Sequence, residues 1–181
     1  MKKTFQLLFL CLFTLSIFSC GDDDEMSVLD GTWTAQSSEF DVTTTTTTNG
    51  SNFSSQSVGS TTAIDYDLVF TGSNFTTSGS YTYDVTTSVD GSVVNSGSNP
   101  VSDVSGAGTY SVDGSVITIN GSFFELEFNG QPLVGANGPQ MANFTINGDI
   151  LTFNQNETTT SMEGGAASTS TIVSTSVWER Q

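Results

Sequence analysis

The chain contains no histidine, and this absence excludes several kinds of functional site. A Ser-His-Asp or Cys-His nucleophile, a zinc site with histidine ligands and an imidazole pH switch all require that side chain. Basic residues are almost as rare: Lys2, Lys3 and Arg180 stand against 19 acidic residues, and the formal net charge is -16. Phosphate backbones and anionic lipid headgroups repel such a protein, so nucleic-acid binding is excluded.

Cysteine and proline are also scarce, with two cysteines and three prolines in 181 residues. Cys11 lies within an apolar N-terminal run and Cys20 follows it, so a chain cut between them keeps one cysteine and forms no intramolecular disulfide. After residue 30 no window keeps apolar residues at helical spacing for three turns. The length suits one domain, and we expect that domain to be all-β.

The N-terminus has the three regions of a secretory signal peptide: the basic Lys2 and Lys3, the apolar run from Phe5 to Phe18, and a small residue before Cys20. The apolar run is too short for an ordinary membrane span. Ile17-Phe18-Ser19-Cys20 resembles the lipobox of bacterial lipoproteins, in which the cysteine is acylated and the leader is cut before it. The resemblance implies a signal peptide over residues 1–19 and a lipid anchor at Cys20. A plain secretory leader is the alternative.

Four acidic residues follow the cysteine almost at once: Asp22, Asp23, Asp24 and Glu25. An extended acidic run cannot wrap a cation without a loop, so no metal site is expected there. The run resembles the surface-export signal of Bacteroidetes lipoproteins, which implies an outer-membrane lipoprotein, exposed on a diderm cell; a merely solvated tether is the alternative. We therefore expect residues 20–29 to be the lipidated cysteine and its acidic tether, and residues 30–181 to be the folded domain.

The body has the pattern of strands joined by tight turns. Eight Asn-Gly or Asp-Gly pairs punctuate it, and they favour the turns that join antiparallel neighbours, as at Asp113-Gly114 and Asn147-Gly148. Consecutive strands are therefore expected to pair as an up-and-down meander. The expected strands cover residues 32–48, 60–71, 74–89, 107–112, 115–120, 122–128, 141–147, 150–161 and 168–180, with a looser stretch at 91–106.

Apolar and polar residues alternate in several of these strands, which indicates one buried and one solvated face. Ile64, Tyr66, Leu68 and Phe70 alternate with Asp65 and Asp67. The threonine-rich pieces at 43–48 and 158–160 fit long hairpins, because threonine is β-branched. Eight to ten such strands avoid open edges by closing into a barrel; a β-sandwich is the alternative.

The opening Leu29-Asp30-Gly31-Thr32-Trp33 resembles the Gly-x-Trp start of lipocalins and of lipocalin-like domains in Bacteroidetes lipoproteins. In that family the tryptophan crosses the closed end of the barrel, and a basic side chain of the last strand packs over it. The resemblance implies that Arg180 packs over Trp33. The Thr-Asp-x-x-Tyr type motif of lipocalins is missing, and no C-terminal helix follows the last strand.

Few residues suggest catalysis. Glu125 and Glu127 lie two apart on an expected strand, about 7 Å from each other and close to the carboxylate separation of an inverting glycosidase. Asp65 and Asp67 have the same spacing. Both pairs are better explained as solvated faces, so we expect neither an enzyme nor a cofactor. Trp178 lies next to Val177 and is expected to be the exposed aromatic residue.

The expected function is non-enzymatic binding of a small apolar or amphiphilic molecule inside the barrel. Bulky residues would fill the barrel near Trp33, and an aromatic pocket would open at the other end. The residues expected to line that pocket are Tyr66, Phe70, Tyr83, Tyr110, Phe124, Phe128, Phe144 and Phe153. The alternative is a surface adhesin, or a glycan-binding or structural interaction module, with a solid core; a surface glycosidase is a third and weaker reading.

Overall fold

A computed structural model of the protein describes residues 27–124, 127–128, 131–132, 139–163 and 165–181. Ten strands occur in these residues, and eight of them form one sheet. The eight are β1 (Gly31–Thr48), β2 (Ser51–Thr71), β3 (Asn74–Val89), β4 (Ser92–Asp113), β5 (Val116–Asn120), β8 (Gln140–Asn147), β9 (Ile150–Glu163) and β10 (Ala166–Arg180). The two-residue strands β6 (Glu127–Phe128) and β7 (Gln131–Pro132) pair with each other.

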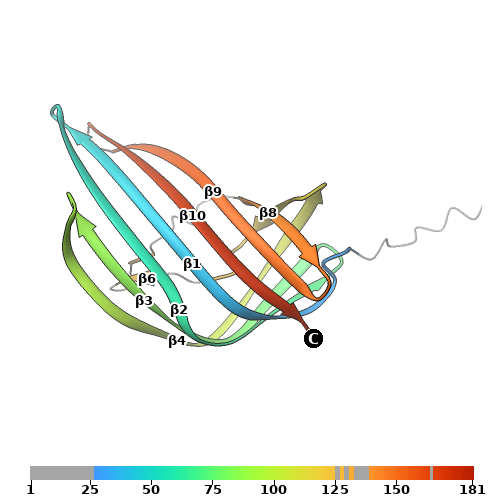
Figure 1. Cartoon of the computed structure of the whole chain (residues 1–181). Coiled ribbons are helices and arrows are strands. Elements are labelled where there is room, and N and C mark those ends of the chain that lie inside the picture. Colours follow the sequence, from blue (N-terminus) through green and yellow to red (C-terminus); the bar gives the residue numbers. More distant parts are fainter. Residues whose placement is uncertain (1–26, 125–126, 129–130, 133–138, 164) are drawn as a thin grey trace, which may run out of the picture.

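The eight strands close into an antiparallel barrel in which chain neighbours pair and β1 pairs with β10 (Figure 1). This confirms the predicted all-β meander and its closure, and it excludes the sandwich. The tight turns form where predicted: Gly114 and Gly148 adopt φ values of 60° and 61°, in the left-handed region that glycine tolerates best.

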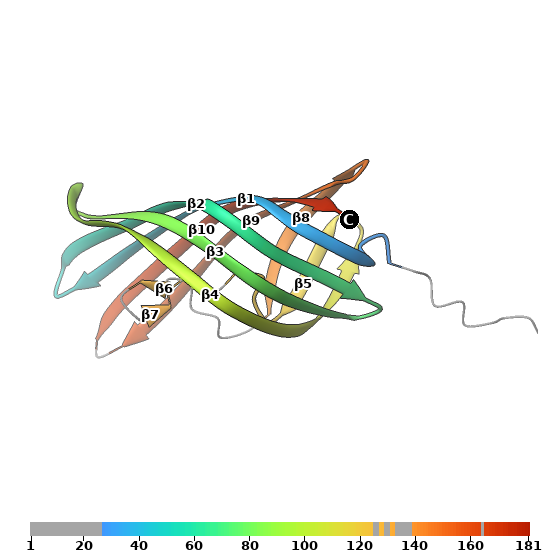
Figure 2. The same ribbon diagram turned by 90° about the horizontal axis from the view of Figure 1, so that it is seen from below.

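The ring is complete only at the end nearest the C-terminus, because β5 and β8 are short; we call this end the closed half and the remainder the open half. β5 pairs with β8 over Val116–Ile119, and β4 pairs with β5 over Thr109–Asp113. Among the described pairings, the rest of β4 contacts only β3, and β9 beyond Asn154 contacts only β10. Three long hairpins, β1–β2, β3–β4 and β9–β10, therefore extend beyond the closed half, away from the C-terminus (Figures 1 and 2).

Three of the expected strand boundaries are wrong. The predicted strand over 122–128 does not form: residues 121–124 are not in a strand, β6 covers only Glu127–Phe128, and residues 125–126 lie outside the described part of the chain. The stretch at 91–106, predicted to be loose, belongs to β4 and pairs with β3. β2 also begins at Ser51 rather than at residue 60, which lengthens the threonine-rich β1–β2 hairpin.

The predicted alternation is confirmed along β2, where Tyr66, Leu68 and Phe70 are buried while Asp65 is exposed. The expectation that Trp178 is exposed is wrong, because its side chain is fully buried. Its neighbour Val177 is half-buried and takes the outward position of the pair. The indole Nε1 of Trp178 donates a hydrogen bond to Ser176 Oγ at 2.9 Å, which satisfies its polar group inside the barrel.

Trp33 and Arg180 lie opposite each other where the first and last strands pair. The guanidinium carbon of Arg180 lies 4.1 Å from the centroid of the Trp33 ring, which confirms the predicted stacking. Arg180 also donates to the main-chain oxygens of Asp30 at 2.7 Å and Val28 at 2.9 Å, and Trp33 Nε1 donates to Leu29 O at 2.7 Å. This end of the barrel is closed by side chains tied to the entering chain.

Among the described residues there is no helix long and apolar enough to cross a membrane.

Candidate functional site

The barrel interior is the first candidate site, because the sequence predicted an aromatic pocket there. Seven of the eight predicted lining residues are in the hydrophobic core or pack against it; the side chain of Phe128 lies outside the described part of the structure. These rings pack on one another, as when Phe70 contacts Tyr110 edge to face at a centroid distance of 4.8 Å. In the closed half they fill the interior rather than line an open space.

The connection after β5 places two rings in the interior: Phe124, which was predicted, and Phe123. Phe123 packs against Phe75 and Phe153 at centroid distances of 5.0 and 5.1 Å, and Phe124 packs against Trp178 at 5.3 Å. Tyr66 Oη donates a hydrogen bond of 2.7 Å to the main-chain oxygen of Phe123, which fixes this segment across the barrel. Phe123 was not among the predicted pocket residues.

A small cavity of about 70 Å³ remains beside this segment. Phe123, Phe124 and Phe153 contribute its apolar side, and polar groups such as Ser174 and Gln155 contribute the other. Pockets that bury a drug-sized ligand usually measure about 300–1,000 Å³. The cavity therefore has room for a few water molecules but not for an amphiphile.

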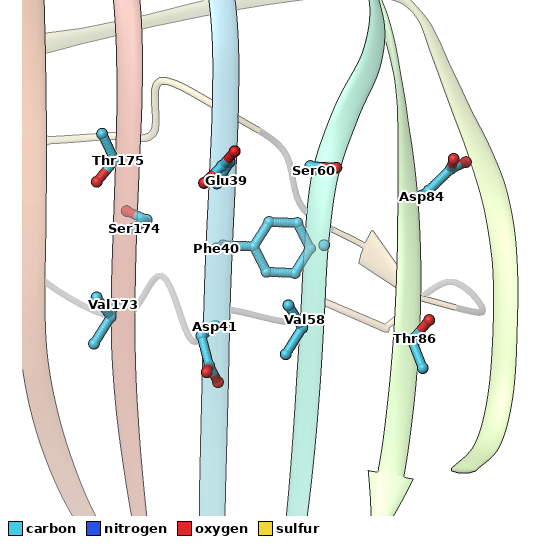
Figure 3. Close-up of a pocket in the computed structure, with 11 residues that line it drawn as sticks. Glu39, Phe40, Asp41, Val58, Ser60, Asp84, Thr86, Val173, Ser174 and Thr175 are labelled. Atoms are coloured by element: carbon cyan, nitrogen blue, oxygen red, sulfur yellow. The ribbon is translucent and has the colours of Figure 1, made fainter.

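A larger depression of about 520 Å³ lies on the outer face of the sheet, across β10, β1, β2 and β3 (Figure 3). We call it the outer groove. Its outward-facing residues form two rows across the four strands, as the strand register shows. The first row is Thr175, Glu39, Ser60 and Asp84, and the second is Val173, Asp41, Val58 and Thr86.

The two rows combine carboxylates with exposed apolar surface. Glu39 and Asp84 belong to one row and are separated by the strand that carries Ser60, so their backbones lie roughly 10 Å apart. Val58 and Val173, in the other row, keep 47% and 46% of their surface exposed, which is high for valine in a sheet.

The groove carboxylates receive hydrogen bonds from hydroxyl and amide groups. Asp41 accepts from Gln56 Nε2 at 2.8 Å and from Thr43 Oγ1 at 3.3 Å, and Asp84 accepts from Ser98 Oγ. No basic side chain lines the groove. The arrangement can attract a positive charge and cover an aliphatic chain, but it contains no nucleophile activated by a base.

The inner face under the groove is closely packed. Phe40 is buried and its ring lies against Gly59, where an added Cβ would be 2.4 Å from Phe40 Cζ. Phe40 also packs edge to face on Tyr83 at 6.2 Å. Glycine at position 59 thus lets the ring lie directly on the β2 backbone, behind the two outward rows.

The remaining predicted site residues are not gathered into a centre. Asp65 is exposed, and Asp67 accepts a hydrogen bond of 2.6 Å from Thr34 Oγ1, which is a structural role. The predicted lipidation and export residues, Cys20, Asp22, Asp23, Asp24 and Glu25, lie outside the described residues, as do the side chains of Glu125 and Glu127. The described residues contain no cluster of three or more potential metal ligands.

Sequence reasoning missed the outer groove because it depends on the register of four strands. The β1–β2 pairing shifts between Thr34 and Glu39, and the β2–β3 pairing shifts between Thr61 and Ala63. A bulge changes which residues face each other, and hydropathy alone does not locate it. The adjacent Phe123-Phe124 after Gly121 was the available signal for the inward segment, since two neighbouring rings do not fit a half-solvated strand.

No protein-family model, curated protein or solved structure matches the chain.

Proposed function

We propose that the protein is a lipid-anchored, non-enzymatic binding module of the bacterial cell envelope that acts through its outer surface. The lipobox-like Ile17-Phe18-Ser19-Cys20 and the acidic residues after it support the anchor and a position on the cell surface. Of the two functions expected from the sequence, an interaction module with a solid core is favoured over a carrier of small molecules.

The filled barrel interior is the observation that carries this choice. Trp33, Trp178, Tyr66 and Tyr83 are each no more than 1% exposed. Phe123 and Phe124 both pack against Trp178, and Phe124 also packs against Tyr66. An eight-stranded barrel has room either for its own side chains or for one small ligand. Only about 70 Å³ is left next to Phe123, so a ligand of ordinary size would have to displace the segment.

The position of the anchor fits a module that presents its surface outward. Arg180 bonds to Val28 O, so the described chain begins at the same end at which it finishes. The three long hairpins lie at the opposite end (Figure 2). A chain tethered through Cys20 then holds the closed end towards the membrane and the hairpins away from it.

A thermal-shift assay with fatty acids, lysolipids and small aromatic compounds separates the two functions. A ligand present at 100 times its dissociation constant stabilises a protein by about 2.7 kcal/mol. For a domain of this size that is a rise in melting temperature of about 5–11 °C. We expect no compound to raise it by more than 2 °C. A reproducible rise in melting temperature of about 5–11 °C would instead support the binding of a small molecule inside the barrel.

A further inference from the structure

We propose that the outer groove is a docking site for an extended, lysine- or arginine-bearing segment of a partner protein. The inference rests on the proposed surface function and adds the site and the chemistry of the partner. It is carried by the groove's shape, its charge and its exposed valines together, since acidic residues occur over much of this chain.

Charge complementarity identifies the sign of the partner. Glu39 and Asp84 flank Ser60 in one row, and Asp41 lies in the next row, roughly 7 Å along β1 from Glu39. The chain's bases are Lys2, Lys3 and Arg180, and Arg180 is bound to Trp33 and two main-chain oxygens at the closed end. The described protein therefore has no base of its own to neutralise this groove, and a cation from outside can fill that role.

The exposed valines indicate what carries the cation. Lysine and arginine side chains lay their aliphatic stems on apolar surface while the charged end stays near water. A charged end above Ser60, between Glu39 and Asp84, places such a stem over Val58 in the neighbouring row (Figure 3). A bare metal ion would gain nothing from the apolar contact with Val58. Carboxylates next to an exposed valine therefore favour a basic side chain over a metal ion.

The extent of the groove favours a peptide segment over a single amine. Its residues come from four adjacent strands, which span roughly 14 Å across the sheet. Hydroxyl groups of Ser60, Thr86 and Thr175 lie among the carboxylates and can bond to peptide groups between two basic side chains. The backing by Phe40 and Gly59 keeps the surface in shape before the partner arrives, which lowers the entropy lost on binding.

The test measures binding of acetylated tetralysine to the purified full-length chain in neutral detergent, by fluorescence anisotropy at low salt. The double variant Glu39→Gln with Asp84→Asn removes two groove charges and keeps the side-chain shapes. The matched control, Asp113→Asn with Glu179→Gln, removes two exposed charges that do not line the groove. Exposed ion pairs are individually weak, so we expect the groove variant to lose about fivefold or more in affinity and the control less than twofold.

Two further arms complete the test. Val58→Ser, which keeps every charge, should also weaken binding by about twofold or more if the stem lies on that valine, and spermidine should compete more weakly than tetralysine. Equal losses in the groove and control variants would assign binding to the overall negative field and overturn the proposal. Spermidine competing as well as the peptide would overturn the choice of a protein segment. Neither result bears on the thermal-shift test, so the solid-core function can survive the failure of this site.

Discussion

Replacing Arg180 with methionine should destabilise the protein through loss of the contacts that close the barrel. Arg180 donates two hydrogen bonds to main-chain oxygens and stacks on Trp33 at 4.1 Å. A hydrogen bond from a charged donor contributes about 1.5–3 kcal/mol when shielded, and a cation–π contact about 0.5–2 kcal/mol. Because Arg180 is only half-buried, we take the lower values and expect a loss of about 3 kcal/mol, or roughly 6–12 °C in melting temperature.

Urea titration followed by tryptophan fluorescence measures this loss, since Trp33 and Trp178 are both fully buried and report on unfolding. Arg180→Lys keeps the charge but lacks the planar guanidinium group that reaches both oxygens. It should therefore lose about half as much free energy of unfolding as the methionine variant. Glu179→Gln, at the exposed neighbouring position, is the control and should stay within 0.5 kcal/mol of the wild type. A methionine variant as stable as the wild type would refute the role of Arg180 in closing the barrel.

Four further predictions follow from single residues. Cys20→Ser should move the protein from the membrane to the soluble fraction of lysed cells, and continued membrane partitioning would contradict the lipid anchor. Gly59→Ala should destabilise by about 1–3 kcal/mol in urea titration, because its Cβ would be 2.4 Å from Phe40 Cζ; an unchanged midpoint would show that the ring has room to move. Thr77→Val should raise stability by about 1 kcal/mol, because Thr77 Oγ1 is buried without a hydrogen-bond partner, and a loss would show that the hydroxyl has one. Burial raises the pKa of Tyr110 above its usual 10.0, so its uncharged hydroxyl stabilises the fold fully below pH 10 and this stabilisation is lost as the pH rises above 10. The free energy of unfolding of Tyr110→Phe should therefore fall less at alkaline pH than that of the wild type.

Much of the fold could be predicted because turn residues and alternation act locally. Strand β3 has the predicted bounds, and the turns at Asp113-Gly114 and Asn147-Gly148 join the predicted strands. The contact of Arg180 with Trp33 was predicted from the resemblance to the Gly-x-Trp opening, and the pairing of the first and last strands brings the two residues together. These features depend on a few residues each, and those residues are in the sequence.

The errors occur where a partner in space decides the outcome. Residues 92–106 are rich in serine, glycine and asparagine and show no alternation of apolar and polar residues. They nevertheless form a strand, because their main chain pairs with β3. Trp178 was assigned to the wrong face because its neighbour Val177 was taken as the inward residue. In the folded barrel Ile172, Ser176 and Trp178 are the buried positions of β10, and Val177 faces outward.

The Phe123-Phe124 segment shows a conflict between local and global preference. Its neighbourhood has the spacing of a half-buried strand, which is why a strand was predicted there. The interior of the closed half is lined with rings from other strands, however, and Phe123 lies within about 6 Å of Phe70, Phe75 and Phe153. Burial of two phenylalanine side chains stabilises by about 1.5–3 kcal/mol each, which exceeds what a short strand gains from its ladder.

The outer groove lies near the boundary between the apolar interior of the closed half and the polar interior of the open half. In the open half the inward positions carry hydroxyl pairs, such as Thr44 with Ser170 at 2.9 Å, whose net stabilisation is small. The last inward apolar pair before them is Val42 with Ile172, and the layer of Phe40, Tyr83 and Val85 lies next to it. Phe40 is flanked along β1 by the outward Glu39 and Asp41, so the groove lies near the end of the apolar core of the barrel. Local opening is rarest where apolar burial is dense, so we expect the proposed binding surface to open less often than the hairpins beyond it.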